Sequence, residues 1–436
     1  MRNRWILFFL ALSTASFAYS CGSDSIQTTQ SIPTPPSNPP IQNPNNSTSG
    51  CMGSEQAMSL LNKPQNPSGI RYVKTQPIQS DALLIDLEFL PQRNGDSILI
   101  SKSGKVSYLK NDFIPLGNSF QLAVQNSGEQ GLLNVIADPQ YNENCLIYFY
   151  LSPQGGNLNR VIRAEVTSNI SQNNFSLSDF QTIIEISKTG LNNSSSPGTN
   201  HNGGALLFDS TGALLIATGD GGGSASSNTV DNISQRSNTR LGKILRIIPS
   251  KTKGIGSFTI PSGNNSLSGA LPEIYSYGLR NPFTMILSNH GILIGDVGLN
   301  SYEEINLLSQ AGQNFGWPQV EGPVANPSYL DPVIGYNHSS DLIHHDYEDP
   351  ENNGNGESII ALHYFDSNSY YAPFLSDEIL YSDFFHGWVR SYHLTNHADR
   401  HLTHQEALTS LQKAPNGVLY GTSLGENQIL RLDLIP

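Results

Sequence analysis

The chain has 436 residues, of which only 14% are charged, and its formal net charge is −13 at pH 7. Such an acidic balance argues against a nucleic-acid-binding protein, which needs clustered lysine and arginine to hold phosphates. Glycine (39 residues) and proline (26 residues) are abundant and long helical patterns are scarce, which favours an all-β protein made of short strands and turns.

The first 20 residues are predicted to be a signal peptide. Two arginines lie within residues 1–4, and residues 5–18 form a short apolar segment. Residues 18–21 resemble a bacterial lipoprotein cleavage site, with Cys21 as the lipidated residue. The alternative is an ordinary cleaved signal peptide, which leaves Cys21 as a free thiol. The sequence thus predicts export to the periplasm or an outer-membrane-anchored lipoprotein. The lipid is the only expected membrane contact, because no later run reaches the ~20 apolar residues that span a bilayer.

Residues 21–50 are predicted to be a disordered tether, because they consist largely of Ser, Thr, Pro, Asn and Gln and offer little to bury. The rest of the chain, residues 51–436, is predicted to form one β domain. Cys51 and Cys145 form a disulfide if the compartment is oxidising, which would clip the start of the domain to its body. Two buried free thiols fit the sequence equally well.

One short unit recurs along the domain, consisting of a turn, an apolar strand, a polar or glycine-containing turn and a second apolar strand. The turns that open the six copies lie at residues 91–95, 138–141, 209–212, 288–291, 377–378 and 414–417. Six copies of one hairpin predict a six-bladed β-propeller, with four strands in each blade and long insertions in the loops. A β-sandwich or a series of unrelated hairpins is the alternative.

The loop after the first strand of each copy is expected to lie on one face, around the central channel. Three of these loops are rich in glycine or polar residues: 219–223, 295–301 and 382–387. His201 and Asp220 flank one hairpin, so the turn between its strands returns both to the same end of the sheet. A histidine beside a carboxylate is the minimal arrangement of a general base. A structural histidine near a Gly-Asp-Gly turn is the alternative interpretation.

Four further motifs occur in a fixed order. They are GEQGLL at 128–133, IYSYGLRNPF at 274–283, GDVGLN at 295–300 with EEIN at 303–306, and GQNFGWP at 312–318. Together with the His201 segment they resemble the glucose/sorbosone dehydrogenase family of soluble quinoproteins. That family consists of six-bladed propellers that use pyrroloquinoline quinone (PQQ) and calcium. The resemblance covers most of residues 87–434. No GxGxxG motif follows a strand and opens a helix, so the sequence offers no nicotinamide site as a different hydride acceptor.

The resemblance implies three catalytic roles. His201 matches the general base that accepts the proton of the sugar C1 hydroxyl while hydride passes to the quinone. Asp220 matches the carboxylate that orients this histidine. Arg280 matches the cation that stabilises charge developing on the reactive quinone oxygen. An arginine paired with a carboxylate at a blade edge is the alternative interpretation of Arg280.

The resemblance also implies binding roles. Glu129 and Asn281 match cofactor contacts. The backbone carbonyls of Gly298 and Leu299 match the ligands of the cofactor-bound calcium, a cation that prefers oxygen donors. A second, structural calcium in some family members lies in the region that corresponds to Glu304 and the backbone of Phe315. Blade architecture alone is the alternative explanation of residues 295–300 and 317–318, and residues 347–357 are expected to be a solvated acidic loop rather than a calcium site.

One segment departs from the family pattern. Sugar dehydrogenases of this family carry arginines just before the last turn, where they hold the PQQ carboxylates, but residues 407–417 contain no arginine. Charge-assisted hydrogen bonds are roughly twice as strong as neutral ones, so the change bears on cofactor affinity. Lys413 and Arg390 are the candidate substitutes in cofactor binding.

The sequence therefore predicts a PQQ- and calcium-dependent enzyme that oxidises an aldose or related sugar and passes electrons to an external acceptor. The alternative is a non-catalytic exported propeller that binds carbohydrate or protein at the same face. A metal-dependent hydrolase of the lactonase type is a third hypothesis. It would need carboxylate, Asn or His ligands at the channel, and the glycine-rich loops supply few of them.

Overall fold

The computed structural model describes residues 51, 53–54, 56–78, 83–155, 157–188, 198–222, 233–264, 269–338 and 358–436. The predicted signal peptide, lipidated cysteine and tether lie outside these residues, as does the acidic loop at 347–357. No helix in the described part of the chain is long and apolar enough to cross a membrane.

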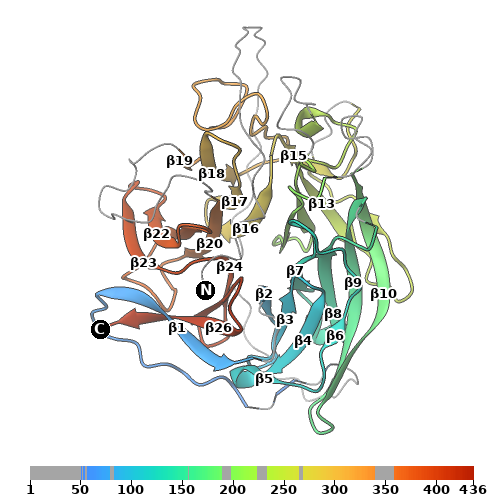
Figure 1. Ribbon diagram of the computed structural model, residues 1–436, viewed down its shortest axis with the longest axis vertical. Helices are drawn as coiled ribbons and strands as arrows, with labels where there is room; N and C mark the ends of the chain where they lie inside the picture. The colour runs from blue at the N-terminus through green and yellow to red at the C-terminus, as the bar shows by residue number, and fades with distance from the viewer. Residues whose placement is uncertain are drawn as a thin grey trace.

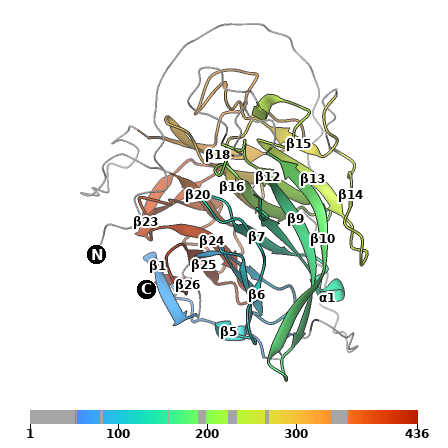
Figure 2. The same cartoon turned by 45° about the vertical axis from the view of Figure 1, so that its right-hand side comes forward.

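The described residues form six antiparallel sheets around one axis, which confirms the six-bladed β-propeller (Figure 1). The first blade contains the strands β2 (Leu84–Phe89), β3 (Ser97–Ser101), β4 (Lys105–Lys110), β5 (Ile114–Pro115) and β6 (Phe120–Gln121). The second blade contains β7 (Leu132–Ala137), β8 (Leu146–Leu151), β9 (Leu158–Asn169) and β10 (Asn174–Ser187). The third blade contains β11 (Gly203–Phe208), β12 (Leu214–Thr218), β13 (Lys243–Pro249), β14 (Phe258–Thr259) and β15 (Ile274–Tyr277). The β9–β10 hairpin is the longest of these and projects past the neighbouring strands (Figure 2).

The last three blades complete the ring. The fourth blade contains β16 (Pro282–Ser288), β17 (Gly291–Asp296), β18 (Tyr302–Leu308) and β19 (Ile334–Asn337). The fifth blade contains β20 (Ile359–Phe365), β21 (Glu378–Asp383), β22 (Trp388–His393) and β23 (Asp399–His404). The sixth blade contains β24 (Leu408–Lys413), β25 (Leu419–Ser423), β26 (Gln428–Ile435) and β1 (Gly69–Pro77). The helices are short: η1 (Asn111–Phe113), α1 (Tyr141–Asn144) and η2 (Ile233–Gln235). Each recurrent hairpin of the sequence supplies strands to a different blade.

The innermost strands, β2, β7, β11, β16, β20 and β24, contact one another around the axis. Each of them carries a register shift against the second strand of its blade, for example between Gly203 and Leu206 in β11 and between Pro282 and Thr284 in β16. A β-bulge bends a strand and increases its local twist. The same irregularity in all six blades is a second sign of repetition, which the sequence pattern did not show.

The ring closes by pairing the two ends of the domain. β1 lies antiparallel to β26, with Gly69 opposite Ile435 and Tyr72 opposite Leu432. The last blade therefore takes its outermost strand from the N-terminal end of the domain and its other three from the C-terminal end.

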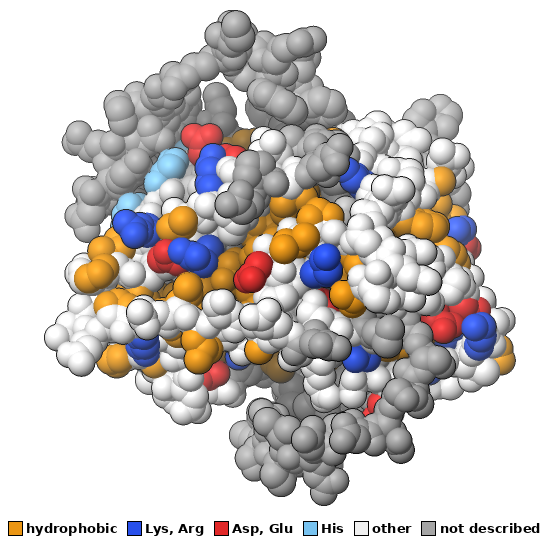
Figure 3. Space-filling model, turned by 90° about the horizontal axis from the view of Figure 1, so that it is seen from below, with side chains coloured by type: hydrophobic (Ala, Val, Ile, Leu, Met, Phe, Trp, Pro, Cys, Tyr) orange, Lys and Arg blue, Asp and Glu red, His pale blue; other side chains and the backbone are white. Residues whose placement is uncertain are grey.

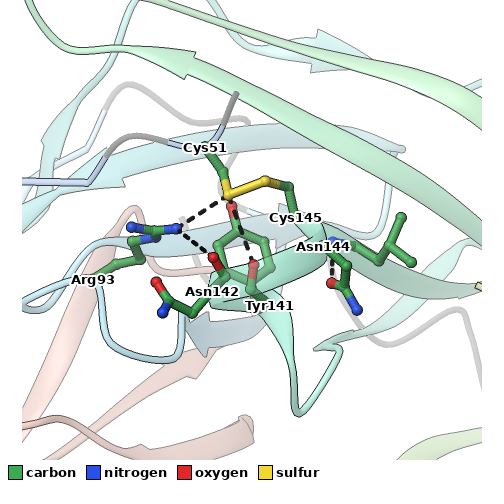
Figure 4. The surroundings of a disulfide bond; sticks show 7 residues. Cys51, Arg93, Tyr141, Asn142, Asn144 and Cys145 are labelled. Atoms are coloured by element: carbon green, nitrogen blue, oxygen red, sulfur yellow. Dashed lines mark hydrogen bonds between the residues drawn. A yellow bond between two sulfur atoms is a disulfide. The ribbon is translucent and has the colours of Figure 1, made fainter. Parts of the chain in front are cut away.

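A disulfide joins Cys51 to Cys145, with their Cα atoms 5.6 Å apart, so the structure selects pairing over two free thiols (Figure 4). Both cysteines are buried, and Cys145 follows α1 in a left-handed conformation. Arg93 places Nη2 3.1 Å from Cys51 Sγ and 3.4 Å from the carbonyl oxygen of Asn142. The disulfide thus attaches the start of the domain to the second blade, at a point where Arg93 of the first blade lies close to it.

On the face shown in Figure 3, the acidic and basic side chains of the described residues do not gather in separate patches but lie interspersed among hydrophobic ones. This distribution agrees with the low content of charged residues in the sequence. Surface charges of this kind contribute to solubility more than to stability.

Side chains of the inner strands connect neighbouring blades. Asp86 Oδ2 accepts a hydrogen bond from the amide of Val135 at 3.1 Å, and Glu88 Oε1 accepts one from the amide of Ala137 at 3.0 Å. Each inner strand pairs with its own blade along one edge, and its other edge faces the axis. The carboxyls of Asp86 and Glu88 bind amides on the axis-facing edge of β7. Burial raises the pKa of Asp86 to about 6 and the pKa of Glu88 to about 8, although the amide hydrogen bonds act in the opposite direction.

The raised pKa of Glu88 makes stability depend on pH. The unfolded chain releases this proton near the ordinary glutamate pKa, whereas the folded protein keeps it up to about pH 8. The folded state binds more protons in that window, so stability falls as pH rises through it. Glu88→Gln keeps an acceptor for Ala137 and should be more stable than wild type by about 1–3 kcal/mol at pH 8, with little change at pH 4.

Urea unfolding at several pH values measures this difference. Glu185→Gln is the matched control, because Glu185 forms a solvent-exposed ion pair with Arg160 at 2.6 Å. Its substitution removes a carboxylate at the surface and should change the free energy of unfolding by less than about 1 kcal/mol. Parallel stability curves for Glu88→Gln and wild type from pH 4 to pH 9 would show that burial of Glu88 does not set this dependence.

Candidate active site

The loops that the sequence predicted to converge lie at one end of the inner strands, here called the loop face. Each inner strand begins where the second strand of its blade ends: Gly203 pairs with Thr218, Pro282 with Asp296, and Ile359 with Asp383. The loops after the second strands therefore meet the loops that lead into the inner strands. His201, Asp220, Arg280, Asn281 and Glu129 come together there.

His201 and Asp220 form the predicted pair. His201 Nδ1 lies 2.8 Å from Asp220 Oδ1, and both side chains are largely buried, with 14% and 12% of their surface exposed. His201 adopts a left-handed conformation with φ of 49°. A Cβ atom at Gly219 would lie 2.0 Å from the carbonyl oxygen of His201, so only glycine fits beside it. The hydrogen bond to Asp220 directs the other ring nitrogen, Nε2, to the role of proton acceptor.

Several donors surround the carboxylate of Asp220. Its Oδ1 also accepts a hydrogen bond from the amide of Gly222 at 2.9 Å, and its Oδ2 accepts one from Trp317 Nε1 at 2.9 Å. Burial by itself raises the pKa of Asp220, but the charge and hydrogen bond of His201, the charge of Arg280 and the Gly222 amide together lower it below the usual value. Asp220 is therefore an anion at neutral pH, as the orienting role requires.

Arg280 lies against the same pair. Its carbonyl oxygen accepts the amide hydrogen of Asp220 at 2.8 Å, and its Nη1 donates to the carbonyl of Val297 at 2.7 Å. The guanidinium carbon is 5.7 Å from the centre of the Trp317 ring. Among the described residues, Arg280 Nε is buried without a hydrogen-bond partner, and no carboxylate forms an ion pair with the side chain. The guanidinium thus keeps donor capacity at the loop face rather than holding a blade edge.

Glu129 and Asn281 connect three blades at the loop face. Glu129 Oε2 accepts hydrogen bonds from the amide of His201 at 2.6 Å and from Asn281 Nδ2 at 3.3 Å. Asn281 Oδ1 accepts the amide hydrogen of Gly203 at 3.0 Å. Buried Lys188 donates to Asn202, and burial lowers the pKa of Lys188 to about 8, an effect that the nearby charge of Glu129 opposes.

The loop that carries Gly298 and Leu299 is organised by Glu321, which the sequence analysis missed. Glu321 Oε1 accepts hydrogen bonds from the amides of Leu299 (2.6 Å), Asn300 (3.1 Å) and Ser301 (3.2 Å). In a trans peptide, the carbonyl points opposite to the N–H of the next residue. The carbonyls of Gly298 and Leu299 therefore point away from Glu321. This is the orientation that two backbone ligands of a cation on the other side of the loop would need.

In the second predicted calcium region, Glu304 and Phe315 form hydrogen bonds with other groups of the protein. Glu304 accepts hydrogen bonds from the amide of Gly322 at 2.5 Å and from Asn306 at 3.0 Å, and burial raises its pKa to about 7. Phe315 is buried, and its amide donates to the carbonyl of Tyr277 at 3.0 Å. Within the described ranges, no group of three or more His, Cys, Asp or Glu side chains is placed to hold a metal ion. Calcium binding there stays a prediction.

Arg390 and Lys413 do not join the cluster. Arg390 lies on β22, the third strand of its blade, and its Nε donates to Asp399 on the outermost strand at 3.1 Å. Lys413 ends β24 and pairs with Leu419, whereas Leu408 at the start of β24 pairs with Ser423 at the loop face. Neither side chain is therefore placed to replace the missing arginines.

Comparisons with known proteins agree with this architecture. The family model described as "Glucose / Sorbosone dehydrogenase" matches residues 83–342. The HIPL2 protein of Arabidopsis thaliana is 33% identical over 217 residues, which are 43% of this chain and 29% of that protein. Aldose sugar dehydrogenase YliI of Escherichia coli (strain K12) is 29% identical over 196 residues, which are 44% of this chain and 47% of that protein. The chain thus spans less than half of the length of these two relatives.

Solved structures of low sequence identity share the fold. The PQQ-bound aldose sugar dehydrogenase from Streptomyces coelicolor superposes with a TM-score of 0.61 at 21% identity, over 85% of this chain and 99% of that one. The apo-form of the soluble aldose sugar dehydrogenase from Escherichia coli gives a TM-score of 0.61 at 20% identity, over 84% and 99% of the two chains. Because the family model matches more than half of the chain, and the motifs and six-bladed fold agree with it, this protein belongs to the glucose/sorbosone dehydrogenase family.

Proposed function

We propose that this protein is a PQQ- and calcium-dependent dehydrogenase that oxidises an aldose or related sugar. The observation that carries the proposal is the hydrogen bond of 2.8 Å between His201 Nδ1 and Asp220 Oδ1, on the loop face beside Arg280. Oxidation of a hydroxyl group by hydride transfer needs a base for the hydroxyl proton and a cofactor that accepts the hydride. The base is supplied by the chain, and the quinone of PQQ supplies the hydride acceptor when it is bound.

His201 performs the proton transfer. Because Asp220 accepts the Nδ1 proton, Nε2 is the nitrogen that accepts the proton of the sugar hydroxyl. The imidazolium that forms lies next to the Asp220 carboxylate, whose negative charge stabilises it. Arg280 offers a buried Nε without a protein partner to oxygen that gains negative charge in the transition state.

The chemistry of the donors fits PQQ and calcium on this face. Arg280 and Asn281 are a cation and an amide beside the histidine, and both suit the quinone oxygens and carboxylates of PQQ. The carbonyls of Gly298 and Leu299 point away from Glu321, which suits a hard cation that prefers oxygen ligands. Glu129 fixes the backbone of His201 and the side chain of Asn281, so it positions groups of two blades at once.

A non-catalytic propeller that binds carbohydrate or protein at the loop face is the second candidate. The observation that favours it is the absence of arginine from residues 407–417, together with the distant positions of Arg390 and Lys413. The cofactor carboxylates would then have fewer cationic partners than in the family pattern. The buried His201–Asp220 pair and the unpartnered Arg280 Nε favour the enzyme over this candidate.

The cellular setting is also a proposal. A disulfide between Cys51 and Cys145 fits an oxidising compartment, and export to the periplasm as a protein anchored through lipidated Cys21 would provide one. A sugar substrate and an external electron acceptor would both be accessible there. Globomycin treatment, or mass spectrometry of the mature N-terminus, tests the lipid anchor: a mature protein that starts at an unmodified residue contradicts it.

The decisive experiment is a titration of the purified protein, freed of residues 1–50, with PQQ and Ca²⁺. We expect a calcium-dependent change in the absorbance of PQQ, which saturates at one cofactor per chain. Addition of an aldose should then reduce the bound cofactor, and an artificial electron acceptor should sustain turnover. Absence of binding at micromolar PQQ with calcium present would reject the enzyme and favour the binding propeller, which glycan arrays would then examine.

A further inference from the structure

Trp317 belongs to the motif at 312–318, from which the sequence gives it no role of its own, yet its side chain contacts two of the three predicted catalytic residues. Its Nε1 donates to Asp220 Oδ2 at 2.9 Å, and its ring centre lies 5.7 Å from the guanidinium carbon of Arg280. The contact with Asp220 connects positions 97 residues apart in the sequence. The indole therefore lies between the acid–base pair and the cation of the proposed site.

The backbone of Trp317 is fixed from two sides. Its amide donates to the carbonyl of Gly278 at 3.0 Å, and its carbonyl accepts a hydrogen bond from Gln235 Nε2 at 2.9 Å. A Cβ atom at Gly278 would lie 2.3 Å from Asn314 Oδ1, so this approach depends on glycine. The indole is thus held by a rigid loop rather than by its contact with Asp220 alone.

The hydrogen bonds to Asp220 are divided between its two oxygens. Oδ1 accepts from His201 and from the amide of Gly222, whereas Trp317 provides the contact at Oδ2. A carboxylate held at one oxygen can rotate about its Cβ–Cγ bond, and a donor at the second oxygen prevents this rotation. Each donor also takes up part of the carboxylate charge, so less of that charge acts on the His201 ring.

We infer that Trp317 is a positioning residue that fixes Asp220 against His201 through its indole N–H and holds Arg280 against its ring. A cation over an indole face is attracted by the ring quadrupole, so one side chain orders both the anion and the cation. The inference rests on the proposed function for its catalytic meaning. The hydrogen bond itself acts on His201 whether or not PQQ is bound.

Trp317→Phe separates the two contacts, because phenylalanine keeps an aromatic face for Arg280 and removes the N–H. With one donor fewer on Asp220, the carboxylate attracts a proton on His201 more strongly. The ¹⁵N NMR resonance of His201 Nδ1 in the cofactor-free protein should therefore move downfield relative to wild type, because a stronger hydrogen bond deshields the donor nitrogen. The acidic limb of the activity profile should move to higher pH, so kcat below the pH optimum should fall by about two- to tenfold.

Two controls distinguish positioning from a loss of structure. Trp388→Phe changes an indole in the fifth blade, where Trp388 packs edge-on against Tyr336 and Tyr381, and should leave the His201 Nδ1 resonance unchanged. In an Asp220→Ala background, Trp317→Phe should cause no further change, because alanine has no oxygen to accept the indole proton. A general loosening of the site would instead add to the effect of Asp220→Ala.

The inference is overturned if the His201 Nδ1 resonance of folded Trp317→Phe equals that of wild type, or if its effect persists in full in the Asp220→Ala background. If Trp317→Phe does not fold, the indole ¹⁵N–¹H resonance of Trp317 in Asp220→Ala decides instead: it must move upfield as the hydrogen bond is lost, and an unmoved resonance contradicts the inference. A protein that fails to bind PQQ but shows the expected His201 shift would reject the proposed function and retain the role of Trp317.

Discussion

Replacement of His201 by alanine is expected to lower kcat for sugar oxidation by about 10²–10⁴-fold, the usual contribution of a general base. The histidine is positioned by Asp220 at 2.8 Å and by the contact of its own amide with Glu129 at 2.6 Å, and its Nε2 has no other task in the proposed reaction. Steady-state kinetics with a saturating aldose and artificial acceptor measure the loss. PQQ affinity should stay within a few-fold of wild type, because the proposed cofactor contacts come from Arg280, Asn281 and the 298–299 loop.

The backbone of His201 calls for a second substitution. Its φ of 49° is unfavourable for alanine, whereas asparagine enters this left-handed region more readily. His201→Asn should therefore lose as much activity as His201→Ala while keeping more of the wild-type stability. Imidazole added to His201→Ala should restore part of the rate. Retention of most of the activity by either folded variant would remove His201 from the role of base.

Removal of the disulfide should produce the largest change in stability. Cys51 and Cys145 are 94 residues apart, and closing a loop of this length lowers the entropy of the unfolded chain. The Cys51→Ser, Cys145→Ser double variant is expected to lose about 2–5 kcal/mol of unfolding free energy. Urea unfolding with and without reductant measures the effect. Reduced wild type should match the double variant, and the double variant should not respond to reductant.

This experiment also tests whether the N-terminal segment depends on the bond. Ser54 donates from its amide to Asp96 at 2.8 Å, so residues near Cys51 have a second attachment to the first blade. Limited proteolysis should therefore cleave before residue 69 faster in the double variant, while the blades stay intact. An unfolding midpoint equal to that of wild type under oxidising conditions would show that these polar contacts hold the segment without the disulfide.

The sequence was informative where structure depends on local patterns. Turns with Gly, Asn or Asp between apolar strands marked the hairpins of all six blades, and the His201–Asp220 pair followed from one hairpin. Strand β1 was not assigned to the last blade, because its partner β26 lies at the other end of the chain. Bulges of the inner strands leave no simple periodic signal, and they were missed for that reason.

Contacts between distant segments explain the remaining differences at the site. Trp317 was considered only as part of a motif and Glu321 was not considered, because nothing nearby in the sequence shows that one reaches Asp220 and the other the amides that follow Gly298. Arg390 was considered for the cofactor because of its charge alone. Its position on the third strand places it about two strand spacings, or roughly 10 Å, outside the inner strand.

The pairing of β1 with β26 has a consequence for the order in which the protein can form. Ser68 Oγ donates to the carbonyl oxygen of Pro436 across a separation of 368 residues, so the seam joins the beginning and the end of the translated domain. During synthesis, β1 must stay unpaired until β26 has been made, and the loop that closes is almost the whole domain. A nascent chain therefore cannot complete its ring early, and loss of even the final eight-residue strand would leave β1 without a partner.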